Sequence, residues 1–364
     1  MPLRWLKLFA AAVLKFTKMT ENLFTGIQQV GIGVKDAWEA FVWYNKNLGL
    51  DVPVFDDVAR AELMIPHTNG IIRERRAILA VNMAGGGGAE IWQSNDPKPL
   101  APAEEPALGD LGIFCVKIKS SNVAALAANL GQSTSTAPNG DTIAFLQDPY
   151  GNQLQLVPDS SWFKKKEDHT GGVLGTIIGV SDMEKSLKLY QDVLGINEVI
   201  YDEMGIFEDF KSLKGGDRKV RRVLLRKTQK PNGAFYKLFG NIEIELVQWL
   251  DGTGKNLMEG RSWGDLGYIH LCFDTLDMEA FKKKTTAAGF PFTVDSGTTF
   301  SMSDAGGRFS YIEDPDGALL EFVETHKVPV LKKIGWFINL QKRGMAKPLP
   351  DWMISTLGWG KVKV

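Results

Sequence analysis

Residues 32–49 read IGVKDAWEAFVWYNKNLG, and residues 178–195 read IGVSDMEKSLKLYQDVLG. Both stretches begin with a short apolar strand pattern, continue with an aspartate, and then carry a helical pattern that contains a tyrosine and ends in Leu-Gly. Aspartate is a preferred residue just before a helix, and glycine is a preferred residue just after one. The two stretches therefore indicate an internal repeat, which predicts two copies of one structural unit.

Three further pairs of segments match between the copies. Residues 148–156 (DPYGNQLQL) and 314–322 (DPDGALLEF) each predict a turn followed by a strand. Residues 75–79 (RRAIL) match 221–225 (RRVLL), and residues 89–93 (AEIWQ) match 244–248 (IELVQ). We expect the arginine pairs on edge strands, where charge keeps a sheet soluble, and keep contact with an anionic substrate as the alternative.

Each copy contains the order strand, helix, strand, strand, strand twice. The predicted helices cover residues 37–47, 123–130, 183–194 and 278–288, and apolar or alternating runs predict the strands between them. The sequence thus predicts an α+β fold of four βαβββ modules.

The length of the chain favours two domains, because 364 residues with 44% hydrophobic content exceed what one core usually holds. We predict an N-terminal extension (1–25), a first two-module domain (26–158), a polar linker (159–171), a second two-module domain (172–325) and a C-terminal tail (326–364).

Composition narrows the classes of function. A formal net charge of −1 gives no general attraction to nucleic acid, and no run of 18 apolar residues is present to span a membrane. The two cysteines, Cys115 and Cys272, form no CxxC pair, which favours a reducing, cytoplasmic compartment. We therefore expect a small-molecule substrate as the partner, with homodimerisation left open.

The two ends of the chain lie outside the repeat. Residues 1–18 combine four basic residues with a short apolar run, and we expect an extension of the reading frame there rather than a secretory signal or a membrane-surface segment. Residues 327–364 are basic and rich in tryptophan. We expect this tail to dock on its own domain; covering a cup, dimerisation and membrane-surface binding are the alternatives.

The repeated strand, aspartate, tyrosine helix and Asp-Pro-x-Gly turn resemble the vicinal oxygen chelate superfamily over roughly Ile27 to Glu324. That superfamily includes glyoxalase I, methylmalonyl-CoA epimerase, extradiol dioxygenases and bleomycin-sequestering proteins. The resemblance implies that the modules form two cupped mixed β-sheets, with one divalent metal held by residues of the first and last strands of a module. Zinc, nickel, iron, manganese and cobalt all suit a set of imidazole, carboxylate and amide donors.

The repeat gives one candidate ligand position in the first strand and one in the last strand of each module. Counting back seven residues from Asp36, Ser120, Asp182 and Asp277 gives Gln29, Ile113, Gly175 and His270. The equivalent positions in the last strands are Glu90, Gln155, Glu245 and Glu321. Only the first and fourth modules carry two potential ligands each.

Two pairings of the modules remain open. A crossed pairing of modules one and four, as in glyoxalase I, would give the site Gln29, Glu90, His270 and Glu321 and leave the second cup without a complete set. A self-paired second half would instead use Glu245, His270 and Glu321. Taken singly, each residue also has a plain structural interpretation, such as a core histidine or a solvent-facing glutamate, so absence of a metal is the third alternative. We favour the crossed site because it leaves one full set of ligands.

The chemistry that the resemblance implies is that of a metal-dependent lyase or isomerase working through an enediolate. Glu321 is the first candidate for the base and Glu90 the second. An extradiol-type dioxygenase is the alternative. Its iron site needs two histidines, however, and the ligand position at residue 175 is a glycine. A binding protein without catalysis is the third class.

Overall fold

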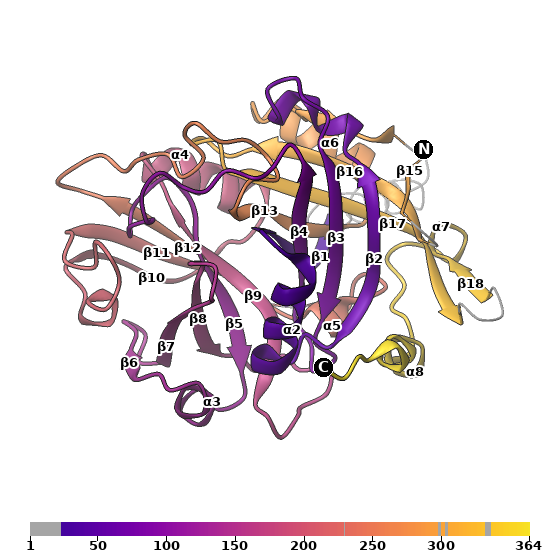
Figure 1. Cartoon of the computed structure of the whole chain (residues 1–364), viewed down its shortest axis with the longest axis horizontal. Coiled ribbons are helices and arrows are strands. Elements are labelled where there is room, and N and C mark those ends of the chain that lie inside the picture. The colour runs from indigo at the N-terminus through magenta and orange to yellow at the C-terminus, as the bar shows by residue number, and fades with distance from the viewer. Residues whose placement is uncertain (1–22, 229, 298–299, 303–304, 332–335) are drawn as a thin grey trace, which may run out of the picture.

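The computed structural model describes residues 23–364, with gaps at 229, 298–299, 303–304 and 332–335. Most of the predicted N-terminal extension, including residues 1–18, lies outside the described residues. The described chain forms two curved mixed β-sheets (Figure 1).

The first sheet has ten strands and combines module one with module four. Its central order is β17, β13, β1 and β4, with β1 antiparallel to β13 and parallel to β4. Its strands are β1 (Phe24–Val34), β2 (Val52–Arg60), β3 (Glu74–Val81), β4 (Gly88–Asp96), β13 (Gly267–Thr275), β14 (Val294–Asp295), β15 (Phe300–Met302), β16 (Ala305–Glu313), β17 (Leu319–Leu331) and β18 (Trp336–Asn339).

The second sheet has eight strands and combines module two with module three. Its strands are β5 (Gly112–Ser120), β6 (Thr134–Thr136), β7 (Thr142–Gln147), β8 (Gln153–Pro158), β9 (Thr170–Gly179), β10 (Glu198–Gly205), β11 (Val220–Lys227) and β12 (Ile242–Trp249). The expected fold of four modules in two cupped sheets is confirmed, and the modules pair in the crossed way. The predicted domain boundaries therefore separate the two copies of the repeat in the sequence. They do not separate the two sheets, because each sheet contains one module from each half.

Helices follow the first strand of every module. They are α2 (Ala37–Leu48), α3 (Val123–Asn129), α4 (Met183–Leu187) with its π-helical continuation η2 (Lys188–Val193), and α6 (Met278–Ala287). Short helices elsewhere are α5 (Tyr236–Phe239), α7 (Leu340–Arg343), α8 (Asp351–Ser355), η1 (Glu62–His67), η3 (Glu208–Phe210) and η6 (Thr356–Gly360).

The repeated aspartate and glycine have the predicted roles. The side chain of Asp36 accepts hydrogen bonds from Trp38 N and Glu39 N, each at 2.9 Å, and Gly49 ends α2 in a left-handed conformation with φ 63°. Asp182 caps α4 through Lys185 N at 3.1 Å.

The two repeated phrases contact each other in space. Tyr44 of α2 donates a hydrogen bond to Asp148 at 2.5 Å, and Tyr190 of η2 donates one to Asp314 at 3.1 Å. All four residues are buried. The repeat thus preserves a buried link between the helix of one module and the closing turn of the next.

One sequence alignment needs correction in module two. The cap of α3 is Asn122, whose side chain accepts from Ala125 N, and not Ser120. Counting back seven residues from Asn122 gives Cys115. The first-strand position that we assigned to Ile113 therefore belongs to Cys115.

The expectation for the arginine pairs was also wrong. They lie on β3 and β11, which are both inside their sheets, and Arg222 is fully buried at 0% exposure. The strand registers, which pair Leu79 with Glu90 and Leu224 with Glu245, place Arg222 at the position equivalent to Ala77. The sequence match of the two Arg-Arg pairs is therefore one residue out of register.

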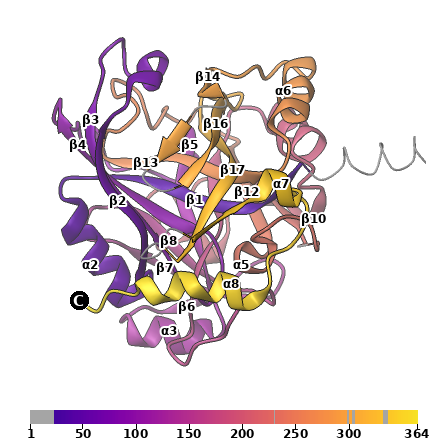
Figure 2. The same cartoon turned by 90° about the vertical axis from the view of Figure 1, so that its right-hand side faces the viewer.

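The described part of the tail packs against both halves of the chain. Leu349 and Ile354 pack with Phe235, Leu238 and other apolar residues around α5. In Figure 2 the yellow segment that contains α8 ends with the C-terminus beside α2. Its last helical turn, η6, contacts β2 and β17. Near that end, Val362 N donates to the carbonyl of Asp51 at 2.8 Å.

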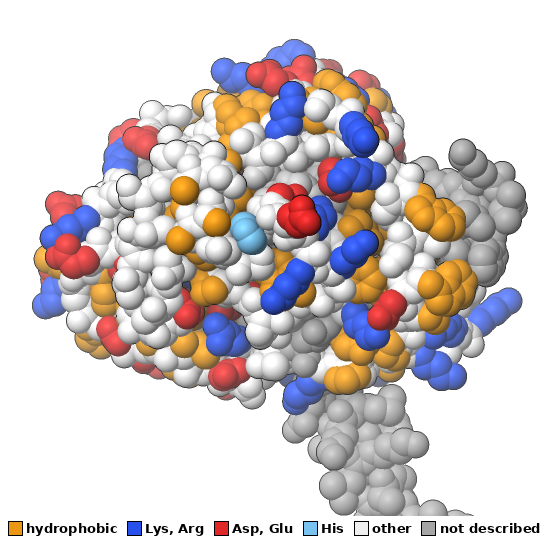
Figure 3. Space-filling view, turned by 90° about the horizontal axis from the view of Figure 1, so that it is seen from below, with side chains coloured by type: hydrophobic (Ala, Val, Ile, Leu, Met, Phe, Trp, Pro, Cys, Tyr) orange, Lys and Arg blue, Asp and Glu red, His pale blue; other side chains and the backbone are white. Residues whose placement is uncertain are grey.

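The surface matches the near-neutral charge of the chain. On the face shown in Figure 3, basic and acidic side chains are interspersed. None of the helices in the described ranges combines the length and apolar content that a membrane crossing requires.

Candidate metal centre

The four residues of the predicted crossed site lie on four adjacent strands at the concave centre of the first sheet, which we call the first cup. Gln29 lies on β1, Glu90 on β4, His270 on β13 and Glu321 on β17. The register pairs Gly31 with both His270 and Glu90, so the ligand positions are nearly level across the sheet. The crossed pairing of the modules is what brings them together.

The side chains of these residues converge. His270 Nε2 lies 3.1 Å from Glu321 Oε2 and 3.4 Å from Glu90 Oε2. Gln29 Nε2 donates to Glu90 Oε2 at 3.0 Å and to Glu321 Oε2 at 3.3 Å. One donor atom from each of Glu90, His270 and Glu321 fits within a mutual distance of 4.8 Å. A single cation could therefore contact all of them, with the Gln29 amide oxygen as a fourth donor.

The imidazole ring is held in place on two sides. Tyr311 lies edge-on to the ring, with its hydroxyl 3.4 Å from His270 Nδ1. On the other side lies Gly31, where a Cβ atom would come within 2.5 Å of His270 Cε1. Glycine at this position gives the ring its space, and the contact with Tyr311 leaves Nε2 directed toward the carboxylates.

The polar atoms of the cluster are buried, and not all of them have a hydrogen-bond partner. Gln29, Glu90, His270 and Glu321 are each at most 7% exposed, and His270 Nε2 makes no well-directed hydrogen bond. Burial would lower the pKa of His270, but the Glu321 and Glu90 carboxylates raise it to about 9. Two carboxylates around one imidazole with an unsatisfied nitrogen fit a divalent cation, which would satisfy all three groups.

A cavity of about 840 Å³ opens above the cluster, and Gln29, Glu90 and Glu321 form part of its lining. Its walls are mainly aromatic and aliphatic. They include Phe55, Leu79, Trp92, Trp263, Phe309, Tyr311 and Val323 from the sheet and the loops beside it, and Phe235, Phe239, Leu357 and Trp359 from α5 and the tail. The tail therefore contributes one end of the cavity.

The alternative ligand Glu245 lies in the second sheet, apart from His270 and Glu321. It is fully buried and forms ion pairs with Arg222 and Lys117. The self-paired set of Glu245, His270 and Glu321 is therefore not assembled.

Sequence reasoning missed the residues that support the site, Gly31 and Tyr311. Gly31 follows Gln29 by two residues inside the predicted strand, and glycine within a strand was the available signal for a close approach. Nothing in the sequence pattern marked Tyr311, because its contact with His270 depends on β16 lying across β17 from β13.

Comparisons with known proteins agree with the fold. The model of the Glyoxalase/Bleomycin resistance protein/Dioxygenase superfamily matches residues 168–322. A lactoylglutathione lyase of Haemophilus influenzae is 25% identical over 159 residues, which cover 42% of this chain and 91% of the relative.

Solved structures with 15% identity share the fold. A glyoxalase I variant from Zea mays matches with a TM-score of 0.50 over 82% of this chain and 93% of that chain. A putative dioxygenase from Bacillus subtilis matches with a TM-score of 0.55 over 94% of this chain and 98% of that chain. The superfamily model thus matches the second half of the chain, and the described chain as a whole, with its repeated modules and paired cupped sheets, has the fold of these structures.

Proposed function

We propose that the protein is a metal-dependent lyase or isomerase that acts on a small substrate with two neighbouring oxygens. The observation that carries this proposal is the convergence of Gln29, Glu90, His270 and Glu321 at the floor of a large cavity. We assign these four residues as the ligands of one divalent ion, whose identity among zinc, nickel, iron, manganese and cobalt is open.

A divalent ion in this site would supply Lewis acidity, polarising the oxygens of a carbonyl and its neighbour. Glu321 is the proposed base: it takes a proton from the carbon beside the carbonyl, which gives an enediolate, and returns the proton to the adjacent carbon. Glu90 is the second candidate, since it also faces the cavity. In the metal-free protein the charge of His270 lowers the pKa of Glu321 against the effect of burial. A divalent ion bound in its place would favour the ionised carboxylate in the same way.

The cavity walls favour a substrate with an apolar body. Aromatic side chains bury large areas of an apolar ligand, and Arg60, Arg75, Arg308 and Lys327 add basic partners to the same lining. We therefore propose an α-hydroxycarbonyl compound with an aryl or alkyl body.

Solvent deuterium exchange tests this chemistry without knowledge of the natural substrate. 2-Hydroxyacetophenone in deuterated water should lose the signal of its hydroxymethyl protons in NMR at a rate that depends on added divalent metal. Glu321→Gln should slow this exchange by about a hundredfold or more, while the matched variant Glu313→Gln, at a half-exposed glutamate of β16, should not. Equal exchange in the Glu321 variant would refute the role of the base.

An extradiol-type dioxygenase is the second candidate, because the aromatic walls of the cavity also suit a catechol. Among the described residues, however, His270 is the only histidine of the cluster, and ring-cleaving iron sites use two. Oxygen consumption with catechol and with 4-phenylcatechol in the presence of ferrous iron would favour this candidate, and its absence would leave the lyase or isomerase. If neither reaction occurs but 2-hydroxyacetophenone binds, the protein belongs to the binding class.

A further inference from the structure

The centre of the second sheet, formed by β5, β8, β9 and β12, is built like the first cup, and we call it the second cup. The registers establish equivalent positions: Gln29 is opposite Cys272, which pairs with Glu321, and Gly175 is opposite Lys117, which pairs with Gln155. The counterparts of Gln29, Glu90, His270 and Glu321 are therefore Gly175, Glu245, Cys115 and Gln155. The second cup thus retains a thiol, an amide and a carboxylate at potential ligand positions.

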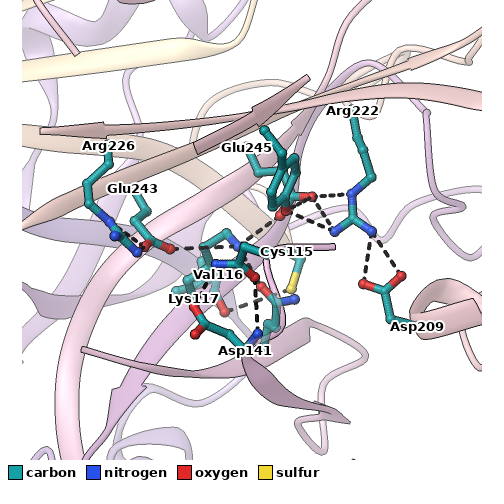
Figure 4. A network of polar contacts seen from close by, with 12 residues as sticks. Cys115, Val116, Lys117, Asp141, Asp209, Arg222, Arg226, Glu243 and Glu245 are labelled. Carbon is teal, nitrogen blue, oxygen red and sulfur yellow. Dashed lines mark hydrogen bonds and ion pairs between the residues drawn. The ribbon is translucent and has the colours of Figure 1, made fainter. Parts of the chain in front are cut away.

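Lys117 lies at the centre of this set. Its Nζ is 2.8 Å from Glu245 Oε2 and 4.0 Å from Glu243 Oε2 (Figure 4). The same atom is 2.8 Å from Gln155 Oε1. Lys117, Glu245 and Gln155 are each at most 2% exposed. The lysine ammonium therefore contacts the counterparts of Glu90 and Glu321, the two carboxylates proposed to bind metal in the first cup.

Gly175, the counterpart of Gln29, cannot contribute a ligand. A Cβ atom on Gly175 would lie 1.7 Å from the carbonyl oxygen of Glu243, so the backbones of β9 and β12 leave no room for a side chain there. Lys117 is the residue directly opposite Gly175 in the sheet. The Lys117 ammonium therefore comes from β5, the strand opposite the position of Gly175, where a ligand is missing.

Arg222 fills the space that corresponds to the cavity of the first cup. It replaces the equivalent Ala77, and its guanidinium lies 2.5 Å from Glu245 and 2.9 Å from Asp209 of η3 (Figure 4). It also lies 3.8 Å from the centre of the Phe210 ring. The second cup is therefore closed by side chains of the chain itself.

The charges of the second cup depend on these cations. Burial would raise the pKa of Glu245, but Arg222 and Lys117 hold it at about 2, so the carboxylate stays ionised. A buried carboxylate needs a compensating charge, and truncation of its partner leaves that charge exposed to any cation that can enter.

We infer that Lys117 is a built-in replacement for a divalent ion in the second cup, and that its removal opens a metal site formed by Cys115, Gln155 and Glu245. A thiolate in the ligand set selects zinc or cobalt over magnesium or calcium. Binding would release the thiol proton of Cys115, whose pKa is raised by burial in the metal-free protein. The native protein would then hold one metal, in the first cup alone.

Cobalt titration in a background without the first site tests this inference separately from the proposed function. The variant His270→Ala should bind little cobalt, whereas His270→Ala with Lys117→Ala should gain about one equivalent, a stoichiometry that follows from one cup. The gain should be accompanied by a thiolate-to-cobalt charge-transfer band in the near ultraviolet. Adding Cys115→Ser should abolish the band.

Lys119→Ala in the same background is the matched control. Lys119 is also a buried lysine of β5, but it pairs with Asp159 at 3.6 Å and lies outside the second cup. A cobalt band in this control, or a folded Lys117→Ala protein without cobalt uptake, would overturn the inference.

A second pair of variants covers the case in which Lys117→Ala does not fold. Lys117→Met should be strongly destabilised in urea, because Glu245 loses a partner, and Glu245→Gln added to it should restore part of the stability. Failure of the double variant to recover any stability would show that Lys117 does not act by compensating charge, and would equally overturn the inference.

Discussion

At the scale of single residues, Gly31 controls how closely the His270 ring approaches β1. A methyl group at this position would lie 2.5 Å from the ring, and Tyr311 blocks the opposite side. We expect Gly31→Ala to displace His270 from Glu90 and Glu321 and to weaken divalent metal binding by roughly 10- to 100-fold, the usual range for a misplaced ligand. Isothermal titration with zinc measures the change.

The matched control for this substitution is Gly205→Ala on β10. An added Cβ there meets its first neighbour only at 4.0 Å, so metal binding should not change. Native affinity in Gly31→Ala would contradict the proposed role of the His270 position.

Lys227 gives a pH-dependent contribution to stability. Its Nζ lies 3.7 Å from the centre of the Phe24 ring and has no hydrogen-bond partner among the described residues, and burial, then Lys284 and Lys230, lowers its pKa to about 7. Because the unfolded chain keeps the ordinary lysine pKa, it binds more protons than the folded chain above pH 7. This group therefore makes the free energy of unfolding rise with pH through that range, by roughly 2 kcal/mol between pH 7 and pH 9.

Replacing Lys227 with methionine should remove this rise, which urea unfolding at several pH values would detect as a flatter profile than that of the native chain. The exposed neighbour Lys230 is the control, since Lys230→Met should retain most of the pH dependence. A native slope in Lys227→Met would show that the lysine is not desolvated as its position indicates.

At the scale of elements, local sequence predicted the strands, the helices and their caps, because these depend on contacts within a few residues. The pairing of modules does not depend on such local contacts, because the antiparallel pairs β1 with β13 and β5 with β9 join distant parts of the chain. Comparison of ligand positions between the modules nevertheless favoured the crossed arrangement. It failed at Ile113 because the spacing was counted from Ser120 and the helix is capped by Asn122.

The helix α8 anchors the tail through its buried face. Ile354 is 1% exposed, whereas Trp352 on the same helix is 55% exposed. We expect Ile354→Ala to cost about 2 kcal/mol of docking free energy, as loss of a buried aliphatic side chain usually does, and to open the end of the cavity lined by Leu357. Trypsin cleavage in the tail should accelerate in this variant and stay close to native in Trp352→Ala. Equal cleavage rates would mean that Ile354 does not hold the tail.

At the scale of the whole molecule, the two cups share the same strand geometry but differ in the groups that balance their buried carboxylates. In the first cup, two buried carboxylates face one imidazole below an open cavity. In the second cup, Lys117 and Arg222 neutralise the buried acids and fill the space. The first cup has two buried carboxylates around one imidazole, whereas Glu245 of the second cup pairs with both a lysine and an arginine, so the first cup is the one short of positive charge. Sequence periodicity showed which ligands were missing, but it did not show that Lys117 and Arg222 occupy their place.

Metal removal provides the last prediction, because the proposed ligands come from both halves of the chain. Gln29 and Glu90 belong to the first half, and His270 and Glu321 to the second, so a bound ion would bridge the two across the sheet. Binding to the folded state alone stabilises it by about 3 kcal/mol at a metal concentration of 100 times Kd. We therefore expect EDTA to lower the calorimetric Tm of the metal-loaded protein and re-addition of the metal to restore it. His270→Ala should show no such response, while Lys119→Ala should keep it; an equal shift in His270→Ala would place the stabilising metal outside the first cup.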